Sequence, residues 1–430
     1  MQFPSSPRLT QKRILIFRRK LDGVVFSLGA ATFMIASNVS AAVFGIFLVM
    51  GIYLLVFRWT KSLRHLDKNY VLAALLFSAG CLATNLLNGS LPEDMRWSSY
   101  PLYQLLMIPV AVGLVLVRDP LRQFVLGTRV GLVIVFLWAI SGLALALWGG
   151  ADVRAGALRF GMGSNAANAA FAIAFLAVFS RLDVKSPPAL LSSRRIFFYL
   201  AFITVLASQT RAVLPVFMVG LAMDLFGLVR HSRTAWWAAT RQNALTFVAL
   251  LVVGLASLWV LYPIVSQRVQ TTFVEITTTL DNPESSTASG ISTRLVQWKA
   301  AFGLISEHPV LGRGGYGISD AIAEHSSAGN KGDLKRYSFV HNFILDELVQ
   351  RGIVGLTLTL GFFGYCFYRI YSRGDASMKE NVILVLALTL SFGMLHYLLV
   401  IDRHVVLYAL YFLLLITANH GWRPPYKIST

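Results

Sequence analysis

Apolar runs of about 20 residues recur along the whole sequence and constrain the fold more than any other feature. A helix of this length crosses the hydrocarbon core of a membrane, where every backbone polar group must be hydrogen-bonded within the protein. Only 13% of the residues are charged, against about 25% in a typical soluble domain. The sequence therefore predicts an all-α, polytopic membrane protein and excludes a soluble globular fold.

The apolar runs predict about twelve transmembrane helices. We expect them near residues 23–37, 41–57, 70–87, 101–117, 128–148, 165–180, 196–209, 212–228, 243–263, 353–371, 381–399 and 404–419. Several runs are short for a bilayer, so these helices should extend further or be locally irregular. No internal repeat is evident, which weighs against a transporter built from repeated halves.

Lysine and arginine are spread unevenly between the connections, and their distribution predicts the orientation. Cytoplasmic loops carry an excess of these residues, and one side of the twelve-span topology holds 25 of the 38. Both termini are therefore expected in the cytoplasm, with one large loop outside it. The expected divisions are a bundle of nine spans at 1–263, the loop at 264–352, and three spans with a tail at 353–430. The net charge of +18 is explained by this orientation, and we expect no nucleic-acid partner.

The large loop contains one segment with a helical pattern between two polar tracts. Apolar positions recur at helical spacing at Leu295, Trp298, Ala301, Phe302 and Ile305, and the sequence "HPVLGRGGYG" then ends the pattern. We expect short amphipathic helices on the membrane surface beside the bundle, with the tracts 277–290 and 324–338 flexible.

Three arginines are candidates for binding an anion. Arg211 stands between two apolar spans in "ASQTRAVLPVF", at the predicted outer interface and without an adjacent acid. It is either an interfacial residue whose head group reaches water or an anion ligand, helped by the hydroxyl and amide donors of "SQTR". Arg268 and Arg294, alone, are ordinary loop charges. With Arg211 they form a plausible anion cradle, because a guanidinium donates two parallel hydrogen bonds to phosphate.

His341 is the histidine whose position is most suggestive. It lies where a polar loop meets the helical segment "HNFILDELVQRGIVG" (341–355), with Asn342 at the expected helix start. Imidazole is the usual proton acceptor in catalysis, although a single histidine at a helix start is often structural. Glu347 and Arg351, four residues apart, are expected to form a structural ion pair.

Several common catalytic patterns are missing from the sequence. It has no Asp-x-Asp, no P-loop, no dinucleotide fingerprint and no Gly-x-Ser-x-Gly. The carboxylates of the large loop are scattered without a ligand spacing, so we expect neither a metal site nor a nucleotide cofactor. Cys81 and Cys366 both fall in predicted spans, so no disulfide framework is implied.

Three segments between residues 208 and 355 resemble the bacterial O-antigen ligase family of the O-antigen ligase and polymerase superfamily. The segment from His341 to Gly355 resembles the motif His-[Asn/Ser/Gln]-x9-Gly-x-x-[Gly/Thr/Cys]. "RLVQWKAAFGLISEHPVLGRGGYG" (294–317) resembles the stretch Arg-x-x-x-Trp followed by His-Pro-x-x-Gly-x-Gly. "SQTR" (208–211) resembles a Ser-x-Thr-Arg element near the outer membrane face.

The resemblance implies a GT-C-like glycosyltransferase of the bacterial inner membrane with its active site facing the periplasm. Such an enzyme takes a glycan from undecaprenyl pyrophosphate, and a ligase transfers it to a sugar hydroxyl of the lipid A core. The family works without a metal or nucleotide and is thought to invert the anomeric centre. The chemistry agrees, because a pyrophosphate leaving group needs only a base for the acceptor and cations for the developing charge.

By motif position, His341 corresponds to the general base, and Arg211 and Arg294 to functional arginines. Arg268 is placed less securely, because the loop before Arg294 varies in length. Asn342 and Trp298 are candidates for supporting contacts, and the aromatic rings of Trp298 and Tyr316 would serve equally as interface anchors.

Three functions compete on the sequence alone. The first is an O-antigen ligase, which the His-Asn-x9-Gly element favours. The second is an O-antigen polymerase or a protein O-oligosaccharyltransferase of the same superfamily. The third is a transporter of an anionic lipid-linked sugar, which predicts charges near the membrane midplane in broken helices.

Overall fold

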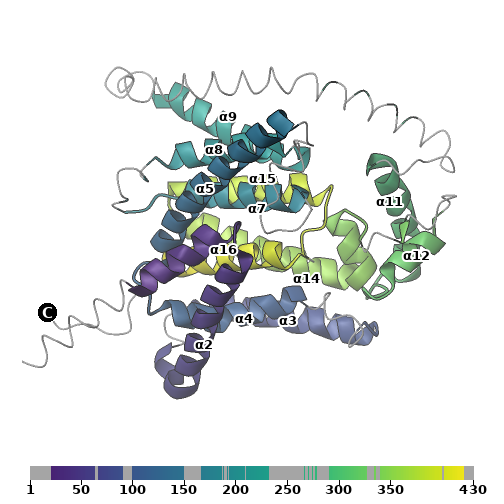
Figure 1. Ribbon diagram of the computed structural model, residues 1–430. Helices are drawn as coiled ribbons and strands as arrows, with labels where there is room; N and C mark the ends of the chain where they lie inside the picture. The colour runs from purple at the N-terminus through teal and green to yellow at the C-terminus, as the bar shows by residue number, and fades with distance from the viewer. Residues whose placement is uncertain are drawn as a thin grey trace, which may run out of the picture.

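The computed structural model describes residues 21–62, 66–90, 99–149, 166–185, 193–208, 210–231, 290–326, 339–399 and 401–420, with a few single residues between them. All regular elements in these residues are helices, as predicted. Besides a first helix at Leu21–Thr32, they are α2 (Ser37–Ser62), α3 (Lys68–Leu87), α4 (Ser99–Leu114), α5 (Pro120–Gly149), α7 (Ala166–Ser180), α8 (Arg194–Ala207), η4 (Arg211–Val213), α9 (Leu214–His231), α11 (Gly290–Glu307), α12 (Ile318–Glu324), α14 (Phe343–Arg373), α15 (Ala376–Gly393) and α16 (Asp402–His420). Most lie side by side in one bundle, with α11 and α12 beside one end (Figure 1).

Five of the described helices are long and apolar enough to cross a membrane. They are Asn38–Phe57, Lys68–Leu87, Pro120–Gly142, Phe343–Arg373 and Ala376–Gly393, and the apolar helices Leu21–Thr32, Tyr100–Leu114 and Ala166–Ser180 are shorter. These helices support a multi-pass membrane protein. The number of twelve spans and the outer position of the large loop stay predictions, and the expected span 243–263 lies outside the described residues.

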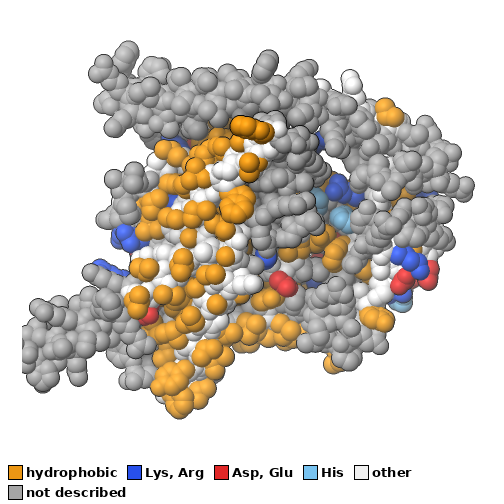
Figure 2. Space-filling view, in the orientation of Figure 1, with side chains coloured by type: hydrophobic (Ala, Val, Ile, Leu, Met, Phe, Trp, Pro, Cys, Tyr) orange, Lys and Arg blue, Asp and Glu red, His pale blue; other side chains and the backbone are white. Residues whose placement is uncertain are grey.

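The helices α7 and α16 form the centre of the bundle. In α7 almost every side chain is buried, as expected for a helix that is apolar all round. Its rings pack on those of α16, with centroids 4.9 Å apart for Phe175 and Tyr408 and 5.4 Å for Phe179 and Tyr411. In contrast, α2 exposes large apolar side chains such as Phe57, and Figure 2 shows hydrophobic atoms covering this outer face. We interpret that face as the one in contact with lipid.

The two ends of the bundle differ in which helices begin and which finish there. At one end α14 and α16 begin and α15 finishes, beside α11 and α12 (Figure 1). We call it the histidine end because His341, His396 and His404 lie there. At the opposite end α14 and α16 finish, and Asn381 near the start of α15 donates to the Val178 carbonyl (2.6 Å) near the end of α7.

Buried cations tie the helices together at the opposite end. The guanidinium of Arg181 donates two hydrogen bonds to the Asp224 carboxylate (2.9 and 2.8 Å), which also accepts from the Tyr199 hydroxyl (2.8 Å). Arg129 donates to the Ser180 carbonyl at the end of α7 (2.8 Å), where a helix leaves its last carbonyls unpaired. These contacts fix α7, α8 and α9 relative to one another.

Candidate active site

The start of α14 is fixed by a side-chain cap. The Oδ1 atom of Asn342 accepts hydrogen bonds from the backbone N–H groups of Ile344 (3.1 Å) and Leu345 (3.2 Å), and asparagine is among the best residues for this role. Its Nδ2 donates to the Met394 carbonyl (3.4 Å), in the turn after α15. Asn342 therefore holds the beginning of α14 against the end of α15, which is a supporting role.

His341, directly before this cap, has a backbone conformation that is unusual for a residue with a side chain. Its φ of 59° lies in the left-handed region, which persists only where surrounding contacts enforce it. Its Nδ1 atom is 3.2 Å from Oε1 of Gln297 and 3.2 Å from the Phe339 carbonyl. A backbone carbonyl can only accept, so Nδ1 carries the proton of the neutral ring. Nε2 is then the unprotonated nitrogen, as a general base requires.

Two more hydrogen bonds hold the turn that carries His341. The indole Nε1 of Trp298, on α11, donates to the Val340 carbonyl (3.0 Å). The Val340 N–H donates to Oδ1 of Asp346, one turn into α14 (2.7 Å). The turn is thus fixed from both α11 and α14. Trp298 therefore supports the candidate base through the backbone.

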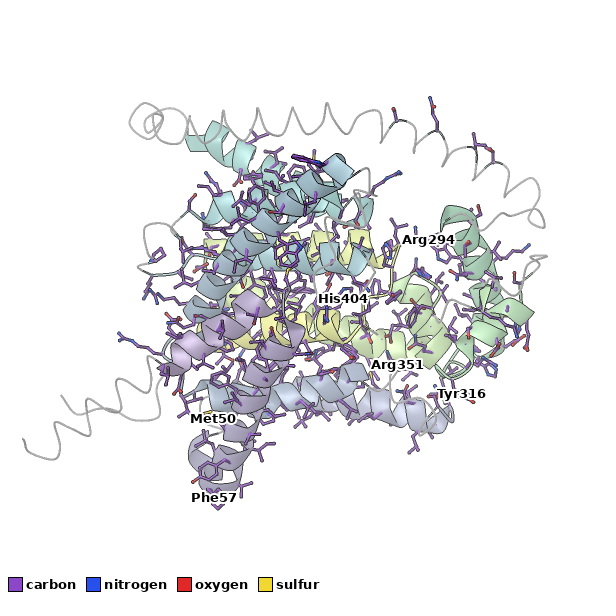
Figure 3. All side chains as sticks on the ribbon, viewed as in Figure 1. Met50, Phe57, Arg294, Tyr316, Arg351 and His404 are labelled. Atoms are coloured by element: carbon purple, nitrogen blue, oxygen red, sulfur yellow. The ribbon has the colours of Figure 1, made fainter. Side chains whose placement is uncertain are left out.

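Electrostatics keep the His341 ring neutral. Burial lowers the pKa of His341 to about 4, and the nearby guanidinium of Arg294 adds to this effect. The imidazole is therefore unprotonated at pH 7. Figure 3 shows Arg294 on the side of α11 nearest the bundle. An anion bound to Arg294 would offset its charge and so raise the pKa of His341.

Tyr397 and His396 lie close to His341, and a third histidine lies in the core at this end. The ring of Tyr397 lies 5.5 Å and that of His396 6.4 Å from the His341 ring, measured between centroids. His404, near the start of α16, is fully buried and points into the bundle core (Figure 3). Figure 2 shows histidine atoms beside Lys or Arg atoms where the bundle meets the α11 and α12 segment. The histidine end therefore presents imidazole and guanidinium groups together.

The helix α14 is broken at Gly352, and a loop docks into the break. Gly352 has φ 61° and ψ −161°, a conformation reserved for glycine. Residues 309–314 run along the break and exchange four backbone hydrogen bonds with it: Ile353 to Pro309, Val354 to Val310, Arg313 to Val349 and Gly314 to Gln350, at 2.8–3.2 Å. These bonds satisfy backbone groups that the break would otherwise leave unpaired inside the protein.

Glycine is required on both sides of this contact. A Cβ on Gly352 would lie 2.3 Å from the Val310 carbonyl oxygen, and a Cβ on Gly312 would lie 2.4 Å from the Gln350 carbonyl carbon. The side chain of Asn88, at the end of α3, donates to the carbonyls of Leu311 (3.1 Å) and Gln350 (2.8 Å). The glycine motifs of the loop and of α14 thus form one structural unit.

Glu347 and Arg351 form the predicted ion pair. Both are buried, Nε of Arg351 donates to Oε2 of Glu347 (3.0 Å), and a second guanidinium nitrogen bonds to Oε1. The Thr359 hydroxyl, beyond the break, donates to the same carboxylate (3.2 Å). The pair therefore bridges the two parts of α14, which confirms the structural interpretation.

Of the other two predicted anion ligands, the structure describes Arg211 but not Arg268. Arg211 is the first residue of η4 and is exposed. The helix α8 starts at the opposite end of the bundle and runs to the histidine end, so Arg211, which follows α8, lies at the histidine end. The Ser208 hydroxyl donates to the Val205 carbonyl (2.6 Å) and accepts from the Thr210 N–H (3.2 Å). It therefore shapes the turn before Arg211. Arg268 lies outside the described residues.

On α11, Phe302 is 61% exposed, whereas Gln297 is fully buried. One expectation for the large loop was wrong. His325 was expected in a flexible tract, but it ends α12 and its Nε2 lies 3.0 Å from Oε1 of Glu307 on α11. The Glu307 carboxylate raises the pKa of His325. This contact links α12 to α11.

Sequence reasoning missed Gln297, the side chain that contacts the candidate base. A signal was present, because Gln297 lies three residues after Arg294 and therefore on the same face of α11. The residue that Gln297 contacts is 44 positions away in the sequence, so its role could not be assigned without the fold.

Comparison with known families agrees with the motifs. Residues 196–360 match the family model described as O-Antigen ligase. The match extends from α8 into α14 and includes all three motif segments, with Arg211, Arg294 and His341. A search of curated proteins found no match. Over residues 196–360, the family model therefore confirms the resemblance to the O-antigen ligase family that the motifs indicate.

Proposed function

We propose that the chain is an O-antigen ligase that transfers a glycan from undecaprenyl pyrophosphate to a sugar hydroxyl of the lipid A core. The observation that carries the proposal is the arrangement of His341: a neutral imidazole whose Nδ1 is bonded to two carbonyl oxygens, with the guanidinium of Arg294 near enough to lower its pKa. The family match supports activity of the ligase or polymerase type.

In this proposal His341 is the general base. Its Nε2 accepts the proton of the acceptor hydroxyl as that oxygen attacks the anomeric carbon. The new glycosidic bond forms while the bond from the anomeric carbon to the pyrophosphate oxygen breaks, and undecaprenyl pyrophosphate leaves with the electron pair. Attack opposite the leaving group inverts the anomeric centre.

The arginines stabilise the leaving group. Arg294 is the cation that acts on His341, and Arg211 lies at the same end of the bundle, so both could contact the pyrophosphate; Arg268 is the third candidate. Guanidinium groups bind phosphate oxygens in pairs and stabilise the charge that develops there. Binding of the donor would also offset the charge of Arg294, raising the pKa of His341 and strengthening the base when the substrate is present.

The location proposed for this reaction is the periplasmic face of the bacterial inner membrane. Both substrates are anchored in lipid, so a site at the end of the helical bundle is accessible to both. The excess of Lys and Arg among the opposite connections supports a cytoplasmic position for that end and for both termini.

A transporter would share one feature with this structure, the broken helix α14. Its break is filled, however, because the backbone groups around Gly352 bond to residues 309–314 and the Asn88 side chain. The buried charges of Glu347 and Arg351 also bond to each other. These contacts favour a structural break over an ion or substrate path.

The proposal is tested with purified protein, donor and lipid A core acceptor. We expect His341→Ala and His341→Asn to abolish transfer without loss of expression or membrane insertion; Asn tolerates the left-handed backbone better than Ala. His325→Ala, which alters another histidine of the large loop, should retain transfer. Substantial transfer by both His341 variants would remove it as the base.

The same assay identifies the acceptor and tests Arg211. Growth of a ladder on the carrier without lipid A core would indicate a polymerase, and glycosylated protein would indicate an oligosaccharyltransferase. Movement of carrier lipid in liposomes without bond formation would indicate a transporter. Arg211→Lys should fail to transfer because lysine keeps the charge but lacks the fork of the guanidinium. Normal transfer by that variant would reduce Arg211 to an interface residue.

A further inference from the structure

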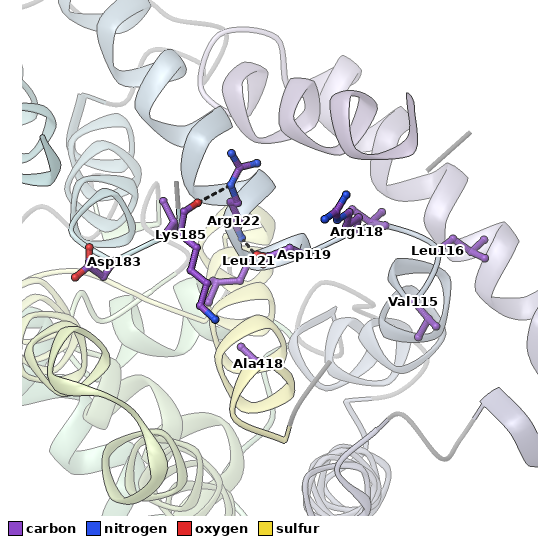
Figure 4. A pocket seen from close by; sticks show the side chains of 11 residues that line it. Val115, Leu116, Arg118, Asp119, Leu121, Arg122, Asp183, Lys185 and Ala418 are labelled. Carbon is purple, nitrogen blue, oxygen red and sulfur yellow. Dashed lines mark hydrogen bonds between the residues drawn. The ribbon is translucent and has the colours of Figure 1, made fainter. Parts of the chain in front are cut away.

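A cavity lies at the opposite end of the bundle from His341. Its volume is about 500 Å³, and its wall includes Arg118, Arg122, Lys185 and Ala418 (Figure 4). The helix α16 connects the two regions, because His404 is near its start and Ala418 near its end. Fourteen residues of helix separate these positions by about 20 Å. The cavity is therefore separate from the candidate active site.

The cavity combines an apolar wall with three cations. Val115, Leu121, Val184 and other aliphatic residues line it together with Arg118, Arg122 and Lys185. Nε of Arg122 donates to the Lys185 carbonyl (2.9 Å), which holds this guanidinium against the turn after α7. Within the described part of the chain, no hydrogen bond or ion pair involves the guanidinium of Arg118 or the ammonium group of Lys185.

Both acids at the cavity already have partners. Oδ1 of Asp119 accepts from the Arg122 N–H (3.1 Å), at the start of α5. The carboxylate of Asp183, which lines the cavity, lies 3.6 Å from the guanidinium of Arg194, which does not. The three cations of the wall outnumber these two carboxylates, so the wall keeps a positive excess, which favours an anionic ligand.

We propose that this cavity, the Arg118 pocket, binds a phosphate group carried by the headgroup of an anionic membrane phospholipid. Guanidinium and ammonium groups are the side chains that bind phosphate. The pocket lies where membrane-crossing helices finish, at the depth of the headgroups, and basic pockets between helices at this depth bind anionic lipid headgroups. The aliphatic wall provides a surface for the glycerol backbone and the first methylene groups.

The test measures lipid retention by the purified full-length protein in a non-ionic detergent. Native mass spectrometry after addition of dioctanoyl phosphatidylglycerol should show one retained lipid, whereas dioctanoyl phosphatidylcholine should not be retained. The double variant Arg118→Gln, Lys185→Gln should weaken retention roughly tenfold or more. Arg122 is left unchanged, and the Lys185 carbonyl remains, so the hydrogen bond between them is kept. The single variant Arg118→Gln serves if the double variant is unstable.

A matched control removes the same charge from the same end of the bundle. Arg373 and Lys379 are exposed there and do not line the pocket, so Arg373→Gln, Lys379→Gln should retain phosphatidylglycerol like the wild type. Equal retention by the pocket variant, or equal retention of phosphatidylcholine by the wild type, would overturn the proposal. Inorganic phosphate could raise the melting temperature of the wild type and not that of the pocket variant, while phosphatidylglycerol is not retained. That result would support a phosphate site but overturn the proposal that a lipid headgroup occupies it.

Discussion

Replacing Gln297 tests whether the acceptor at Nδ1 of His341 determines the strength of the base. In Gln297→Glu a carboxylate takes the place of the amide oxygen that lies 3.2 Å from Nδ1. Arg294, three residues earlier on α11, favours the charged form of the introduced carboxylate. A hydrogen bond to a charged group stabilises by about 1.5–3 kcal/mol, which corresponds to about one to two pKa units.

The variant should therefore move the pH dependence of transfer in a defined direction. Burial and Arg294 hold the pKa of His341 at about 4 in the wild type, and the carboxylate should raise it to about 5–6. The base must be unprotonated, so activity falls as the pH drops below this pKa. The wild type should be constant from about pH 5.5 to 8, whereas Gln297→Glu should lose activity below about pH 6.

The measurement is kcat/KM for transfer against pH, because this quantity reports the pKa of the free enzyme. Gln297→Met is the control of similar size, which removes the acceptor without adding charge. It should lower transfer about fivefold, the value of one hydrogen bond of about 1 kcal/mol, and leave the pH dependence in place. An unchanged acid limb in a folded, active Gln297→Glu would refute the assignment of Nδ1 as the protonated nitrogen.

Two further predictions concern the broken helix α14, and both are measured as the thermal unfolding midpoint in detergent. Gly352→Ala should destabilise by at least roughly 1–3 kcal/mol from backbone strain alone, since a Cβ would also meet the Val310 carbonyl. Gly361→Ala should change little, because its added Cβ would meet no atom of a neighbouring element within 4 Å. Glu347→Gln should cost roughly 3–5 kcal/mol because it removes the carboxylate that balances a buried guanidinium, against about 1 kcal/mol for Thr359→Val. Equal midpoints within either pair would contradict the role given to the break or to the ion pair.

The positions of most described helices could be predicted from hydropathy, because a helix in lipid must be apolar along its length. The expected spans 70–87 and 404–419 correspond to α3 and α16 within two residues. The prediction failed at 381–399, because α15 ends at Gly393. Of the apolar residues that follow, Leu398 and Leu399 are buried without being helical. The Asn342 side chain donates to the Met394 carbonyl in this turn. Hydropathy indicates that a segment avoids water, but it does not distinguish an apolar helix from an apolar turn.

The sequence predicted individual residues of the candidate site but not the contacts between them. Motif spacing identified His341, Arg294 and Trp298 from single segments of sequence. The bonds from Trp298 to Val340 and from Gln297 to His341 join segments about 40 residues apart, and no local pattern encodes such contacts. The left-handed backbone of His341 could not be predicted either. The residues next to it in the sequence do not require this conformation, which depends on the packing of α11 against the turn.

The spacing between His341 and Gly352 has a geometric explanation in the fold. Asn342 caps the first part of α14 and Gly352 ends it, so the nine residues between them form one short helix of about 13 Å. One end of this helix carries the candidate base, and the other is bonded to the loop 309–314. Each residue rotates a helix by about 100°, so one more or one fewer would turn His341 away from Gln297 while the glycine break stayed in place. The motif therefore specifies the orientation of the base relative to the loop that anchors it, which explains why its histidine and its glycine occur at a fixed separation.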